Sequence, residues 1–133
     1  MKNEIIFIST IHRMSERVAS VMNRLQDDFD VKIINSGQSS FNTEYPANLR
    51  YKEYISKYFS KRNIFNTPGL SHRSEAKSNK NSKHIVDIFK KIVSDKTVAV
   101  ILDDSRCRDH SYEIYSIANS KKAKVFSNFH GNT

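Results

Sequence analysis

Two short runs of consecutive apolar residues constrain most strongly what this chain can fold into. They are "EIIFIS" at residues 4–9 and "KTVAVILDD" at residues 96–104, each about as long as one strand. A strand with one solvent-facing side alternates apolar and polar residues, whereas a strand buried on both faces is apolar throughout. The two runs therefore predict inner strands of a parallel sheet that is covered by helices on both faces.

Amphipathic segments lie between the apolar runs. Residues 10–29 carry apolar side chains at helical spacing, and Ser15 is the predicted N-cap of this helix. The segment "DVKII" at residues 30–34 then predicts a second strand. Strand, helix and strand at this spacing form a βαβ unit, for which a parallel, right-handed connection is expected.

The rest of the chain continues this alternation. An aromatic-rich helix is predicted over residues 47–62, and the polar, low-complexity residues 66–83 predict a mobile surface loop or lid. An amphipathic helix follows at 82–95, ahead of the second apolar run. Ser111 is the predicted N-cap of a last helix, which leads into a strand at 123–128.

These elements predict one α/β domain over residues 1–133. We expect a small doubly wound parallel sheet, Rossmann-like or flavodoxin-like, with helices on both faces. The four predicted strands have the expected order 2-1-3-4. Ligands of such sheets bind at the carboxyl ends of the strands, where the strand order switches direction.

The composition narrows the partners and the compartment. Lys and Arg number 22 against 14 Asp and Glu, a formal net charge of +8, which favours anionic partners such as nucleotides or nucleic acid. The lone cysteine, Cys107, allows no internal disulfide and suits a reducing compartment. No apolar run approaches the ~20 residues needed to span a bilayer. We expect a cytoplasmic protein without membrane contact.

Polar and charged residues cluster around the loops expected at the switch point. A helix N-terminus with free N–H groups, together with nearby arginines, suits a phosphate group. The predicted substrate-binding residues are Ser9, Thr10, His12, Arg13, Asp103, Arg106, Arg108 and Ser111. Two carboxylates, Glu113 in the last helix and Asp87 in the helix before the central strand, suit nucleophile and acid chemistry at a sugar carbon.

The second half of the chain resembles a known family. The segments "DIFKKIVSDKTVAVILDD" and "SYEIYSIANSKKAKVF" resemble the nucleoside 2-deoxyribosyltransferases and the related 2′-deoxynucleoside 5′-monophosphate N-glycosidases. In that family a helical Asp is followed eight residues later by the Asp of an "AD" pair, which opens an apolar strand; Asp87 and Asp95 keep this spacing. The family's "YE(L/I)GxA" helix is matched by Tyr112-Glu113-Ile114 with Ala118. "FISTIHRMSERV" is similar to the family's first strand and the loop after it.

The resemblance implies a function. The family's glutamate, matched by Glu113, attacks C1′ of the deoxyribose, and the acidic residue matched by Asp87 assists at the sugar and the leaving base. The implied activity is N-glycosidic hydrolysis or deoxyribosyl transfer on a nucleoside 5′-monophosphate, without a metal or redox cofactor. Ser111 and Tyr115 stand where the family has glycines that let the backbone approach the ligand, so substrate fit and activity stay open. A homodimer with shared sites also stays open.

Several alternatives remain at this point. A glutamate near a helix start also complements the helix dipole, and Asp87 also fits a solvated helix position. Cys107 and His110 lack the second pair of ligands that a metal site needs. The basic, aromatic stretch 50–62 could bind nucleic acid, although aromatics at helical spacing are more typical of a core. Alternative functions are a TIR-like NAD-cleaving domain and a non-catalytic nucleotide- or nucleic-acid-binding module.

Overall fold

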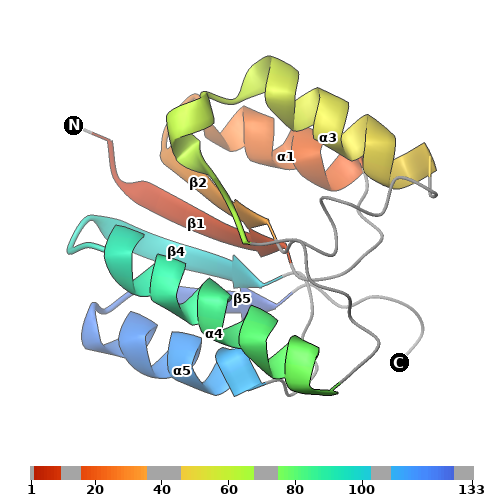
Figure 1. Ribbon diagram of the computed structural model, residues 1–133. Coiled ribbons are helices and arrows are strands. Elements are labelled where there is room, and N and C mark those ends of the chain that lie inside the picture. The colour runs from red at the N-terminus through yellow and green to blue at the C-terminus, as the bar shows by residue number, and fades with distance from the viewer. Residues whose placement is uncertain (1, 10–15, 36–45, 68–74, 103–108, 128–133) are drawn as a thin grey trace.

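The apolar runs form the middle of a five-stranded, all-parallel sheet (Figure 1). The computed structural model describes residues 2–9, 16–35, 46–67, 75–102 and 109–127. The strands are β1 (Glu4–Ser9), β2 (Asp30–Asn35), β3 (Ile64–Asn66), β4 (Thr97–Leu102) and β5 (Lys124–Ser127). The helices are α1 (Glu16–Leu25), α3 (Pro46–Tyr58), the 3-10 helix η1 (Lys61–Asn63), α4 (Glu75–Ile92) and α5 (Asp109–Ser120).

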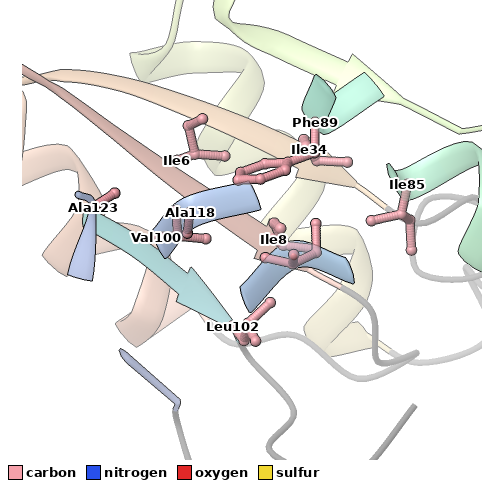
Figure 2. Packing of buried hydrophobic residues seen from close by; sticks show 10 residues of the cluster. Ile6, Ile8, Ile34, Ile85, Phe89, Val100, Leu102, Ala118 and Ala123 are labelled. Atoms are coloured by element: carbon pink, nitrogen blue, oxygen red, sulfur yellow. The ribbon is translucent and has the colours of Figure 1, made fainter. Parts of the chain in front are cut away.

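Two helices lie on each side of the sheet, and alternation along the strands divides the core between the two sides. Figure 1 shows α1 beside α3 on one face and α4 beside α5 on the other. Ile6 and Ile8 of β1 point to α4 and α5, while Phe7 points to α1 and α3, as the two-residue period of a strand requires. Figure 2 shows the α4–α5 side, where Phe89 lies fully buried among the isoleucines of the sheet.

The predicted fold class is confirmed, but the predicted strand order was incomplete. The order is β3-β2-β1-β4-β5, so the four predicted strands keep their neighbours and a fifth strand lies at the edge beside β2. This strand, β3, has only three residues and pairs with β2 alone, too short a segment for alternation to reveal. The order 3-2-1-4-5 is that of Rossmann-type sheets, and it places the switch point between β1 and β4.

Two predicted boundaries were wrong. The loop expected over 66–83 does not extend to 83, because α4 begins at Glu75; its central part, 68–74, lies outside the described residues. Polar composition misled the prediction here, since Glu, Ala and Lys are good helix formers that extend a helix beyond its apolar stripe. Ser111 is not the N-cap of α5, because this helix begins at Asp109 and Ser111 lies in its first turn.

The end of α5 is shaped by a residue with positive φ. Lys122 has φ 61°, the left-handed conformation. The Ala123 N–H donates to the Ala118 carbonyl at 2.9 Å, and the Lys122 N–H donates to the Asn119 carbonyl at 3.1 Å. These two bonds form a Schellman motif, in which glycine usually holds the place of Lys122.

Candidate functional site

The candidate site is the carboxyl edge of the sheet at the switch point between β1 and β4. Ile8 of β1 pairs with Leu102 of β4, so these two central strands end at the same level. In Figure 1 the arrowheads of the strands point to this edge, and the first turn of α5 lies at it. Strands on either side of the switch connect to helices on opposite faces, which leaves a place for a ligand between the connections.

Two buried hydroxyl groups at this edge lack a hydrogen-bond partner within the part of the chain that the structure describes. Ser9, the last residue of β1, is 0% exposed, and Ser111, in the first turn of α5, is 8% exposed. Neither Oγ atom forms a hydrogen bond with any described residue. Buried polar groups are nearly always paired, and leaving one unpaired costs about 1–3 kcal/mol. Such atoms mark positions where a ligand can supply the missing partner.

The two hydroxyls approach the edge from opposite faces. Ser9 follows Phe7 by two residues, so it lies on the face covered by α1 and α3. Ser111 belongs to α5, which covers the other face with Ile114 and Ala118. A ligand seated over the end of β1 and β4 would therefore lie between them.

The neighbouring part of the same edge, at β2 and β3, is fully hydrogen-bonded. The Tyr51 hydroxyl of α3 donates to Asn35 Oδ1 at 3.0 Å, and Asn35 Nδ2 donates to Asn66 Oδ1 at 3.2 Å. The Thr67 N–H also donates to the Asn35 carbonyl at 2.9 Å. Sequence reasoning missed this cluster, although each of the two strands ends in an Asn. Ser9 pairs in register with Asn35, yet among the described residues Asn35 has hydrogen-bond partners and the Ser9 hydroxyl has none.

The two predicted catalytic carboxylates are exposed side chains on α4 and α5. Glu113 is the fifth residue of α5, one turn from the helix start, and its side chain is exposed. Asp87 is also exposed, but it lies twelve residues after the start of α4, about 18 Å along the axis. The end of α4 leads into β4 at the amino edge. Asp87 lies five residues before the end of α4, and Glu113 lies seven residues before the end of α5, which leads into β5 at the same edge.

The remaining predicted substrate-binding residues lie outside the described residues. They are Thr10, His12, Arg13, Asp103, Arg106 and Arg108. Cys107 also lies outside them, and the side chain of His110 is not described. Their roles at the site stay predictions from the sequence.

The basic, aromatic stretch 50–62 contributes mainly to the core. Tyr51, Ile55 and Phe59 are buried against α1 and the sheet, which confirms the expectation that this aromatic stripe is a packing surface. Tyr58 is half-exposed beside Tyr54, with ring centroids 4.6 Å apart, and Lys57 Nζ lies 5.3 Å from the Tyr58 ring. The Tyr58 backbone carbonyl accepts a hydrogen bond from Gln26 Nε2 at 3.0 Å, which connects this end of α3 to the turn after α1.

Two general features of the described residues bear on the site. Within the described ranges, no group of three or more His, Cys, Asp or Glu side chains is arranged to hold a metal ion. None of the helices described here is long and apolar enough to cross a membrane.

Comparison with known proteins adds no relative. No protein-family model matches the sequence, and no curated protein is significantly similar to it. The resemblance to the deoxyribosyltransferases therefore stays a prediction that rests on the quoted motifs. The functional argument depends on the geometry of the carboxyl edge.

Proposed function

We propose that this chain binds a nucleoside 5′-monophosphate at the switch point between β1 and β4 and cleaves its N-glycosidic bond. The observation that carries the proposal is the pair of buried, unpaired hydroxyls of Ser9 and Ser111 at this edge. A bound phosphate or sugar oxygen would accept hydrogen bonds from them and remove the cost of leaving them unpaired.

The phosphate is the part of the ligand that α5 suits best. The helix has twelve residues, and the N–H groups of its first turn favour an anion. Ser111 lies within that turn, so its hydroxyl and the N–H groups would bind the same oxygen atoms. The net charge of +8 further favours an anionic substrate.

Glu113 supplies the chemistry in this proposal. It lies two residues beyond Ser111 on the same helix, and its carboxylate is exposed. In the reaction the carboxylate oxygen forms a bond to C1′ while the bond from C1′ to the base nitrogen breaks. The electron pair leaves with the base, which takes a proton from an acid. Water, or the nitrogen of a second base, then attacks C1′ and releases the carboxylate.

Asp87 is a weaker candidate for that acid in this fold. A general acid has to lie within hydrogen-bonding reach of the leaving atom. Asp87 lies on the exposed side of α4, opposite the buried Ile85 and Phe89. We therefore expect Asp87→Asn to retain turnover, which makes it the matched control for Glu113→Gln.

A base-release assay tests the proposal. Wild type, Glu113→Gln and Asp87→Asn are incubated with deoxynucleoside and ribonucleoside 5′-monophosphates and with NAD, and free base is measured by chromatography. The proposal expects release from a monophosphate by wild type and Asp87→Asn, and a loss of at least 100-fold in Glu113→Gln. Release from NAD alone would favour the TIR-like alternative, and release that persists in Glu113→Gln would refute the role of Glu113.

A second candidate, nucleotide binding without turnover, is favoured by one observation. Glu113 lies two residues after the buried Ser111, about 200° around α5, so its exposed side chain points away from the Ser111 hydroxyl. This candidate expects salt-sensitive binding of the same monophosphates, with no base released and with unchanged affinity in Glu113→Gln.

A further inference from the structure

One half of the sheet face that carries α1 and α3 has no helix over it in the described residues. The helix α1 packs on β2 and against α3, on the side of the sheet away from β5. On β5, Val125 faces the α4–α5 core, so Phe126 and Lys124 face the α1–α3 side. Phe126 is 53% exposed, although it pairs in register with the partly buried Ile101 of β4.

The flank of α1 that borders this area is also apolar and exposed. Asn23 Nδ2 donates to the Tyr54 hydroxyl of α3 at 3.3 Å, which identifies the side of α1 that faces α3. Val21 lies two residues earlier, about 200° around the helix from Asn23, on the side away from α3. Its side chain is 55% exposed. Val21, Ile101 and Phe126 therefore line one open surface, here called the β4–β5 face.

The β4–β5 face is about as wide as one helix. Two strands span about 10 Å across the sheet, which matches the diameter of a helix with its side chains. All-parallel sheets are almost always covered on both faces, because their strands are apolar on both sides. The helices α4 and α5 lie side by side on the opposite face, and α1 and α3 lie side by side on the β2 side of this face, so a further helix would fit over β4 and β5 among the described elements.

The charges around the β4–β5 face are basic. Lys124 lies on the face beside Phe126, and Arg24 lies one turn after Val21; both are exposed, and neither forms an ion pair within the described ranges. The acidic pair Asp27 and Asp28 lies in the turn between α1 and β2. A helix that docks here would therefore be complementary if its apolar stripe were flanked by acidic residues.

We propose that the β4–β5 face docks an acidic amphipathic helix of a partner protein. The apolar stripe of that helix would cover Val21, Ile101 and Phe126, and its glutamates or aspartates would meet Arg24 and Lys124. A second copy of this chain would place two basic faces together and is disfavoured by its net charge of +8. The site lies on a different part of the molecule from the switch point and does not depend on the proposed enzymatic activity.

A selection experiment tests both the surface and the charge of its partner. The probe is a display library of 16-residue helices with leucine at positions of one stripe and a free choice of Glu or Lys at the others. Peptides are selected on wild type and counter-selected on the double variant Val21→Ser with Phe126→Ser, which changes only exposed side chains. We expect enrichment of Glu over Lys, at least tenfold weaker binding to the double variant, and at least fivefold weaker binding to Lys124→Glu.

Four results would overturn the proposal. Enriched peptides that bind wild type and the double variant equally would show that another surface is responsible, and a Lys-rich outcome would refute the charge argument. A failure to enrich any helix would refute the docking site. Sedimentation measures the oligomeric state of wild type and the double variant. A dimer that the double substitution dissociates would assign the face to a second copy of this chain.

Discussion

Replacing Ser111 by alanine should change stability and ligand affinity in opposite directions. In the free protein the Ser111 hydroxyl is buried and unpaired among the described residues. Its removal abolishes a cost of about 1–3 kcal/mol. Alanine is also the better helix former, by about 0.5 kcal/mol. We therefore expect Ser111→Ala to raise the free energy of unfolding by at least about 1 kcal/mol beyond the helix-propensity gain.

The same substitution should weaken ligand binding. A hydrogen bond from a hydroxyl to a charged phosphate contributes about 1.5–3 kcal/mol, so its loss lowers affinity by roughly 10- to 150-fold. Affinity is measured by calorimetry in the Glu113→Gln background, which prevents turnover, with the monophosphate that wild type cleaves fastest. Inorganic phosphate is the probe if no base is released.

Urea denaturation with matched controls isolates the effect of the hydroxyl. Ser116→Ala makes the same change at an exposed position of α5, so it reports the propensity gain alone. Thr97 is equally buried, but its Oγ1 accepts the Ser94 N–H at 3.0 Å, and Thr97→Val should therefore cost about 1–2 kcal/mol. The reasoning is refuted if Ser111→Ala is less stable than Ser116→Ala, or if its ligand affinity is unchanged.

Three further predictions concern stability, each measured by urea unfolding. Lys122→Gly should stabilise the protein by about 1 kcal/mol, because glycine adopts positive φ without strain; a loss would contradict the Schellman assignment. Tyr51→Phe should cost about 1–2 kcal/mol by leaving buried Asn35 without its donor, and no change would mean that water replaces the hydroxyl. Glu4→Gln should cost about 1 kcal/mol through the half-buried pair with Lys32, 2.9 Å apart, and high salt should shrink the difference.

Much of the fold could be predicted from local pattern. The unbroken apolar runs of β1 and β4 require burial on both faces, and that condition alone leads to a parallel sheet between helix layers. The apolar residues at helical spacing predicted the second half of α4, where Ile85 and Phe89 are buried. Its first half was missed because that part of the helix lacks the apolar period which prediction depends on. The edge strand β3 was missed for the same reason.

The candidate site could be predicted less completely. The sequence indicated Ser9, Ser111 and Glu113 near one edge, since strand ends and helix starts meet there in any doubly wound sheet. It also grouped Asp87 with them, and that grouping stays a prediction. The cluster of Tyr51, Asn35 and Asn66 joins residues from three elements, and no local pattern connects them.

The sequence by itself determined that helices lie on both sides of the sheet, because the central strands consist of apolar residues that require burial on both faces. Its net charge of +8 predicts anionic partners. Only the tertiary structure decided which polar groups are paired and which are left open. Asn35 and Ser9 end neighbouring strands in register, yet Asn35 finds partners on α3 and β3 while the Ser9 hydroxyl finds none among the described residues. Hydrogen bonding between distant segments depends on atoms brought within about 3 Å by packing, and that proximity is a property of the folded chain.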